Sequence, residues 1–171
     1  MKTVYIVRHA KSSWKYLDVK DEDRPLKQRG INDAYLMATA LAKNISKPDV
    51  FITSSANRAL HTAVIFSNVF KYPLANLQIN KSLYSFSDGY LIKTIKALDD
   101  SFGTAIIFSH DHGISTFVNT FGNTKIDHVS TTGVIGITFD IDHWKNLNSQ
   151  KSKGKTILID SPKNHKPKKI N

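Results

Sequence analysis

Three short apolar runs constrain the fold of this chain more than any other feature of its sequence. They are TVYIV (3–7), DVFIT (49–53) and TAIIFSH (104–110), and they are rich in the β-branched and aromatic residues that favour strands. Apolar residues recur at helical spacing in the segments that separate or follow them, at 26–43, 57–70, 89–98 and 113–121. Strands that alternate with helices predict an α/β protein, a three-layer α/β/α sandwich around a mostly parallel sheet.

The later part of the chain adds a second kind of pairing. VIGITFD (134–140) and TILI (156–159) are typical of strands, and we expect them to pair as a hairpin. We expect one domain over residues 1–160, followed by a basic and flexible tail at 161–171. Of the formal net charge of +10, the stretch from residue 151 onward supplies +6, because it holds seven lysines and one aspartate.

Composition excludes several classes of protein. Cysteine is absent, which rules out disulfides and thiolate metal sites. No apolar stretch approaches the length of a membrane span. The N-terminal MKTVYIVRHA reaches a charge before an apolar region has formed, so we expect no signal peptide, no membrane and a cytoplasmic protein. The sequence leaves the oligomeric state open.

Polar side chains follow the ends of the three apolar runs. Arg8 and His9 follow the first, Arg58 lies shortly after the second, and His110 ends the third. Because the carboxyl ends of parallel strands share one edge of a sheet, we expect these side chains to converge there. Two arginines suit a phosphoryl dianion, which they bind bidentately. Neighbouring guanidinium charges would keep an imidazole neutral and therefore nucleophilic, and phosphoryl transfer by such a set needs no metal.

Four motifs carry a family resemblance. RHAKSSW (8–14), DRPLKQRG (23–30), SSANRALHTA (54–63) and FSHDHGIS (108–115) together resemble the histidine phosphatase superfamily. Within it the chain is most similar to the SixA-type phosphohistidine phosphatases, over about residues 3–140. The resemblance implies a phosphoglycerate mutase-like fold, no cofactor, and a phosphorylated protein or a small phosphorylated molecule as substrate.

The resemblance also implies a role for individual residues. His9 would be the nucleophile that becomes a phosphohistidine, while Arg8 and Arg58 would grip the phosphoryl oxygens. His110 would be the second histidine of the pocket. Asp21 matches an acidic position near the pocket, where it would manage a proton or orient the substrate.

The identity of the general acid bears on the bond that is cut. Superfamily members that act on phosphate esters usually carry a glutamate acid in the middle of the chain, whereas Glu22 is the only glutamate here. Asp21 or Asp88 would have to replace it. An imidazole leaves more easily than an alkoxide, so we expect phosphohistidine in proteins as substrate, with small phosphate esters as the alternative. Lys11 and Ser12 could line the pocket beside the substrate.

Two other classes of function remain open at this point. His110 and His112, with Asp111 between them, could belong to a metallohydrolase, although no second ligand cluster is obvious. The lysine-rich tail could bind nucleic acid or an acidic partner, although it lacks the interleaved aromatic residues that favour base stacking. A third possibility, a non-catalytic phosphate-binding protein, is disfavoured by the presence of both His9 and His110.

Overall fold

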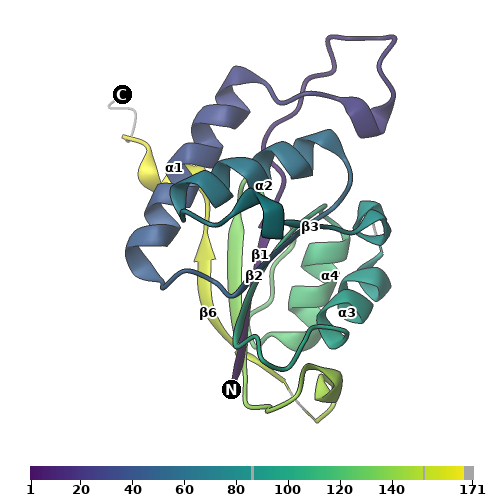
Figure 1. Ribbon diagram of the computed structural model, residues 1–171, viewed down its shortest axis with the longest axis vertical. Helices are drawn as coiled ribbons and strands as arrows, with labels where there is room; N and C mark the ends of the chain where they lie inside the picture. Colours follow the sequence, from purple (N-terminus) through teal and green to yellow (C-terminus); the bar gives the residue numbers. More distant parts are fainter. Residues whose placement is uncertain (86, 152, 168–171) are drawn as a thin grey trace.

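The computed structural model describes residues 1–85, 87–151 and 153–167, and these form a six-stranded sheet with helices on both of its faces (Figure 1). The strands are β1 (Lys2–Arg8), β2 (Val50–Thr53), β3 (Gln78–Ile79), β4 (Thr104–Ser109), β5 (Val134–Phe139) and β6 (Lys155–Asp160). The α-helices are α1 (Gln28–Asn44), α2 (Asn57–Val69), α3 (Asp88–Lys96) and α4 (Gly113–Phe121). The predicted three-layer fold is confirmed.

The order of the strands explains how distant segments meet. The sheet runs β3-β2-β4-β1-β5-β6, and the first four of these strands are parallel to one another, while β5 and β6 form the expected antiparallel hairpin. Arg8 is level with Ser109 across the β1–β4 pair, and Thr53 is level with Phe108 across the β2–β4 pair. The three carboxyl ends therefore lie side by side at one edge.

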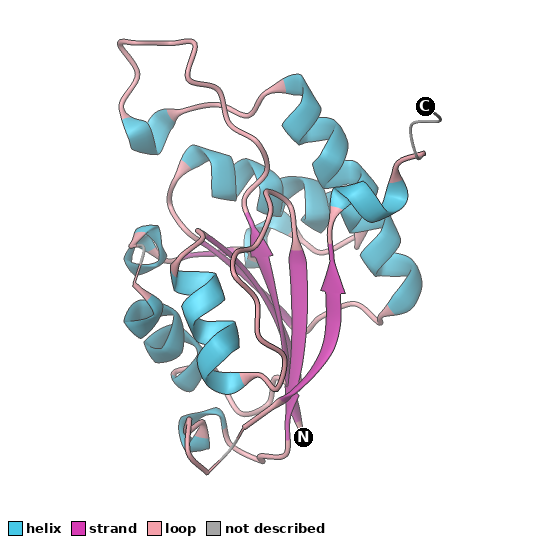
Figure 2. Cartoon of the chain, turned by 180° about the vertical axis from the view of Figure 1, so that it is seen from behind, coloured by secondary structure: helices cyan, strands magenta, loops and turns pink. Residues whose placement is uncertain are grey.

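Side chains that alternate along a strand contribute to two hydrophobic cores, one on each face of the sheet. On β1, Val4 and Ile6 pack with residues of α3 and α4, whereas Tyr5 and Val7 pack with residues of α1 and α2. Because successive side chains of a strand point to opposite faces, one apolar strand contributes to both layers. Figure 2 shows the sheet between these two pairs of helices.

Local contacts define where three helices begin. The first helix begins at Gln28 rather than at Leu26, where its predicted segment starts, because Leu26 bridges to Ser12 in a short antiparallel pairing. The side chain of Ser87 caps α3 by accepting a hydrogen bond from the amide of Gly89. The N-cap residue of α2 is Ala56, whose side chain forms no capping hydrogen bond.

The segment after β6 packs against the domain as far as the structure describes it. A 3₁₀ turn, η5 (Pro162–His165), contacts α1, and Pro162 is buried. Lys166 forms an ion pair with Asp33 of α1, with 2.5 Å between Nζ and Oδ1. Residues 168–171 of the expected tail lie outside the described residues. No helix in the described part of the chain is long and apolar enough to cross a membrane.

Candidate active site

A cavity of about 250 Å³ opens at the edge of the sheet where β1 ends. Arg8 and His9 line it from the end of β1, and Arg58 lines it from α2. The loop that follows His9 contributes further lining, and Thr131 closes another side from the segment before β5. The structure thus brings together three of the four residues expected to be catalytic, and the fourth, His110, lies next to His9.

Hydrogen bonds fix both the backbone amide and the ring of His9. Its amide donates to the carbonyl of Ser109, and its ring Nδ1 lies 2.8 Å from the carbonyl oxygen of Ala10. A carbonyl oxygen only accepts, so Nδ1 carries the proton and the lone pair of the neutral ring lies on Nε2. The hydroxyl of Thr62 in turn accepts from the amide of Ala10, which ties this loop to α2.

Burial keeps this imidazole neutral. Desolvation lowers the pKa of His9 to about 4, and the positive charges of Arg58 and Arg8 lower it as well. At neutral pH the ring is therefore uncharged, as a nitrogen nucleophile must be.

Both arginines have donors that the hydrogen bonds among the described residues leave unused. Arg8 donates from one terminal nitrogen to the carbonyl of Val129 and, at 3.5 Å, to Asp111. Arg58 donates to the carbonyl and the carboxylate of Asp21, at 2.6 and 3.0 Å. The buried Nε atoms of both arginines have no hydrogen-bond partner among the described residues. Buried donors without partners are rare in proteins, and here they fit a site that an anion completes.

The ring of His110 lies next to the ring of His9. The two ring centroids are 5.1 Å apart with an interplanar angle of 53°, and Nε2 of His110 is 2.9 Å from the hydroxyl of Ser54. Burial lowers the pKa of His110 to about 3, and the neighbouring His9 and Arg58 contribute to this shift. His110 is thus placed as a neutral group that can exchange a hydrogen bond with a ligand or with its neighbours.

Asp21 contacts three charged or polar side chains. Its carboxylate accepts hydrogen bonds from Arg24 at 3.0 Å, from Arg58 at 3.0 Å and from the hydroxyl of Tyr84 at 2.6 Å. Burial raises its pKa, but the hydrogen bond from Tyr84 and the charges of Arg58 and Arg24 outweigh this and lower the pKa to about 2. In this arrangement Asp21 is ionised and holds Arg58 in place, which makes it a poor proton donor.

Tyr84 is a site residue that the sequence does not reveal. It lies at the end of a 3₁₀ turn, η3 (Lys81–Tyr84), and packs edge-on against His110 with ring centroids 5.7 Å apart. Its only sequence signal is its place in a polar loop before α3, which many tyrosines share. Its contact with Asp21 spans 63 residues and depends on the tertiary fold.

The loop after His9 is braced against α1. Arg24 donates to the hydroxyl of Ser12 at 2.9 Å and stacks its guanidinium on Trp14, 3.5 Å from the ring centroid. A Cβ atom at Gly30 would lie 2.3 Å from the carbonyl oxygen of Lys11, so only glycine permits this close approach. Lys11 and Ser12 both line the cavity.

Other candidate acids lie away from the cavity lining. Asp88 is in the first turn of α3 and does not line the cavity, and Glu22 accepts a hydrogen bond from Ser55 at 2.5 Å. Asp111 is paired with Arg8. Within the described residues no group of three or more histidines and carboxylates is arranged to hold a metal ion.

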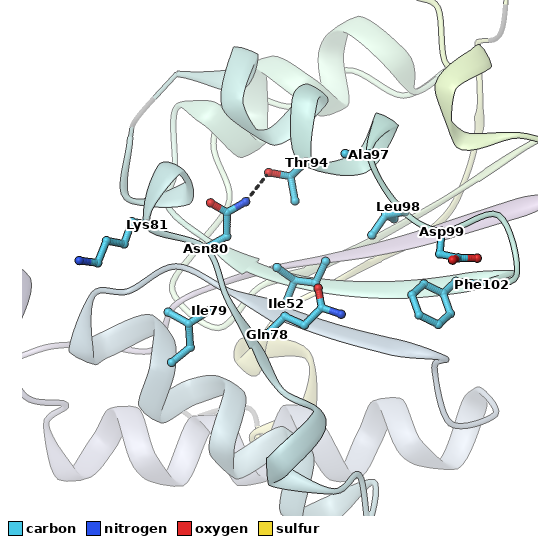
Figure 3. A pocket seen from close by; sticks show the side chains of 10 residues that line it. All are labelled: Ile52, Gln78, Ile79, Asn80, Lys81, Thr94, Ala97, Leu98, Asp99 and Phe102. Carbon is cyan, nitrogen blue, oxygen red and sulfur yellow. Dashed lines mark hydrogen bonds between the residues drawn. The ribbon is translucent and has the colours of Figure 1, made fainter.

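A larger cavity, of about 610 Å³, lies between β3 and α3 (Figure 3). Gln78 and Ile79 of β3 line it together with Asn80, whose side-chain amide donates to the hydroxyl of Thr94 at 3.0 Å. It contains neither a histidine nor an arginine among its lining residues. Size alone would select this cavity, but the chemistry favours the smaller one beside His9.

Comparison with known proteins agrees with the motifs. Residues 4–83 match the family model described as "Histidine phosphatase superfamily (branch 1)". An uncharacterised protein of Mycobacterium leprae is 34% identical over 112 residues, which are 64% of this chain. The match covers 66% of that relative, so the chain spans just under two thirds of its length.

Solved structures share the fold at low sequence identity. The protein histidine phosphatase SixA in complex with tungstate superimposes with a TM-score of 0.80 at 20% identity, over 96% of this chain and 99% of that one. A mycobacterial glucosyl-3-phosphoglycerate phosphatase in complex with VO₃ has a TM-score of 0.69 at 11% identity, over 92% of this chain and 98% of that one. One fold therefore serves a protein phosphatase and a small-molecule phosphatase.

Proposed function

We propose that this chain is a metal-independent phosphatase of the histidine phosphatase superfamily, in which His9 becomes a phosphohistidine. The observation that carries the proposal is the state of His9. It is neutral, its Nδ1–H is held by Ala10, and it shares a cavity with Arg8 and Arg58.

The reaction has two steps. Nε2 of His9 attacks phosphorus as the bond to the leaving group breaks, which transfers the phosphoryl group to the imidazole. Water then attacks the same phosphorus and the P–Nε2 bond breaks, which releases inorganic phosphate and the neutral ring. Arg8 and Arg58 stabilise the charge on the oxygens in both steps, the main task of a protein in phosphoryl transfer.

The poor supply of acids at the site favours phosphohistidine as the substrate. An alkoxide needs a proton in the transition state, and the one carboxyl group that lines the cavity, Asp21, has a pKa of about 2. A phosphohistidine protonated on its far nitrogen releases a neutral imidazole and needs no such donor. We therefore propose phosphohistidine in proteins as the physiological substrate, in line with the SixA-like fold.

A substrate panel tests this proposal. We expect kcat/KM at pH 7 to be at least about tenfold higher for phosphohistidine, free or in a protein, than for phosphoglycerate, because the ester lacks an acid to assist its departure. His9→Ala should abolish both activities, and EDTA should affect neither. A clear preference for alkyl esters would replace the proposal by its alternative, a phosphatase of small phosphate esters.

The metallohydrolase and binding-protein alternatives have their own signatures. Activity that EDTA removes and zinc or manganese restores would favour a metal site at His110 and His112 with Asp111. Salt-sensitive binding of DNA or RNA that is lost on deletion of residues 163–171, without any phosphatase activity, would favour a role for the basic tail.

A further inference from the structure

A second cavity adjoins the catalytic one. It measures about 270 Å³, and Thr131 lines both cavities. Its other walls come from the start of α1 and from the segment around η5, so it lies between the first helix and the last described residues. A substrate group that extends past Thr131 from the phosphoryl site would enter it.

Positive charge dominates this second cavity. Arg29, Lys163 and Lys166 line it, against the single carboxylate of Asp33. Asp33 is buried and is shared by two of these cations, with 2.5 Å to Lys166 and 3.7 Å to Arg29. Lys163 is exposed and forms no ion pair with the described residues. The cavity therefore keeps an excess of two positive charges.

Contacts with the rest of the domain fix the segment that carries Lys163 and Lys166. Pro162 is buried, His165 pairs with Asp160 at 2.6 Å, and Lys166 is anchored on α1 through Asp33. Figure 1 shows the yellow C-terminal turn beside α1. The basic stretch after β6 thus adds a wall to a cavity beside the catalytic site.

We propose that this second cavity binds an acidic side chain of the protein substrate, close in sequence to its phosphohistidine. The inference rests on the proposed function and specifies the substrate as a phosphohistidine flanked by glutamate or aspartate. The three cations are long, exposed side chains from two segments, α1 and the stretch after β6, which suits carboxylates on an extended chain. Opposite charges of this kind contribute mainly to selectivity and to the rate of association.

Two matched peptides provide the test. Both carry one phosphohistidine, which is flanked by glutamates in the first and by glutamines in the second. We expect the wild type to have a higher kcat/KM for the acidic peptide, and this preference should weaken as salt is added. The double variant Arg29→Gln with Lys163→Gln should lose about three- to tenfold on the acidic peptide and little on the neutral one. Both substitutions leave Asp33 its contact with Lys166.

Lys155→Gln is the control variant. Lys155 begins β6 and is paired through Thr138 to Thr3, at the opposite end of the sheet from the active site. It should leave the preference for the acidic peptide intact. All three proteins should hydrolyse free phosphohistidine equally, because it does not reach the second cavity.

Three results would overturn the inference. They are equal kcat/KM of the wild type for both peptides, an equal loss in the Lys155→Gln variant, and a loss of activity on free phosphohistidine in the double variant. Inactivity of the wild type on every phosphohistidine substrate would instead contradict the proposed function. In that case amide NMR spectra test binding to the second cavity separately. The unphosphorylated acidic peptide should shift the amide signals of Ser130, Thr131 and Lys163, and the absence of such shifts would overturn the proposed binding as well.

Discussion

Arg58 is 2% exposed, and two of its three guanidinium nitrogens are held by Asp21. This pairing fixes the plane of the guanidinium group, which matters because a phosphoryl group is bound best by a rigid fork of donors. A lysine in its place would keep the charge but lose the fork. We expect Arg58→Lys to lower kcat/KM by about 10- to 1000-fold, or ~1.4–4 kcal/mol in the barrier.

A control experiment for this substitution tests whether the variant still folds. Circular dichroism and thermal unfolding of Arg58→Lys should show a folded protein, so that the loss reflects the site. Activity within about twofold of the wild type would mean that Arg58 supplies only its charge and that the clamp does not depend on the guanidinium geometry.

The lowered pKa values of the two buried histidines predict how the free energy of unfolding depends on pH. Their pKa values in the folded protein are about 4 for His9 and about 3 for His110, below the ordinary value of 6.5. Below pH 6.5 the unfolded chain therefore binds more protons than the folded one, and the free energy of unfolding falls as the pH falls from about 6.5 toward 4. Urea unfolding at a series of pH values should show this decline, and it should be shallower in His9→Gln.

The sequence predicts the charged residues at the centre of the candidate site, but it does not predict the residues that hold them in position. Arg8, His9 and Arg58 could be placed because each lies at or shortly after the carboxyl end of a strand that reaches the same edge. Asp88 could not be excluded from sequence, since a loop position does not say which way a side chain faces. Tyr84 could not be found at all, because its role depends on a contact with Asp21 that only the folded chain creates.

Among the secondary-structure elements, the end of α2 carries an identifiable strain. Lys71 has a φ of 53°, and the amides of Lys71 and Tyr72 bond to the carbonyls of Asn68 and Ser67, which is the Schellman pattern of a helix end. Glycine adopts this left-handed conformation without the steric cost that a Cβ atom brings. We expect Lys71→Gly to raise the free energy of unfolding by about 0.5–1 kcal/mol.

Urea unfolding measures this effect, with an increased midpoint and an unchanged m-value as the expected result. Lys71 is exposed and does not line the cavity beside His9, so we expect kcat on phosphohistidine to stay the same. A lower midpoint would show that the lysine side chain contributes more at this position than the backbone strain costs.

The existence of the elements could be predicted better than their ends. The helix at Gly113–Phe121 has the predicted bounds, because glycine residues flank its apolar repeat. The start of α1 was predicted two residues too early, since Leu26 has the spacing of the helix but pairs with Ser12 in a bridge. Periodicity reports which residues are buried, and a buried residue next to a helix fits the same pattern.

For the whole molecule, alternation of strands and helices predicts the layers but not the order of the strands. The chain places β4 between β2 and β1, so that His110 follows the strand adjacent to His9. Nothing local in the sequence states this order, which follows from how the crossover helices pack. The same holds for residues 161–167, whose basic composition suggested a loose tail and whose contacts with α1 come from tertiary structure.

The proposed mechanism depends on a covalent phosphohistidine at His9. Purified protein mixed with a phosphohistidine substrate and quenched in alkali should carry a phosphoryl group that is stable to alkali and labile to acid. Mass spectrometry of the digested protein should locate it on His9, and His9→Ala should carry none. A phosphoryl group on another residue, or steady turnover in His9→Ala within tenfold of the wild type, would contradict this mechanism.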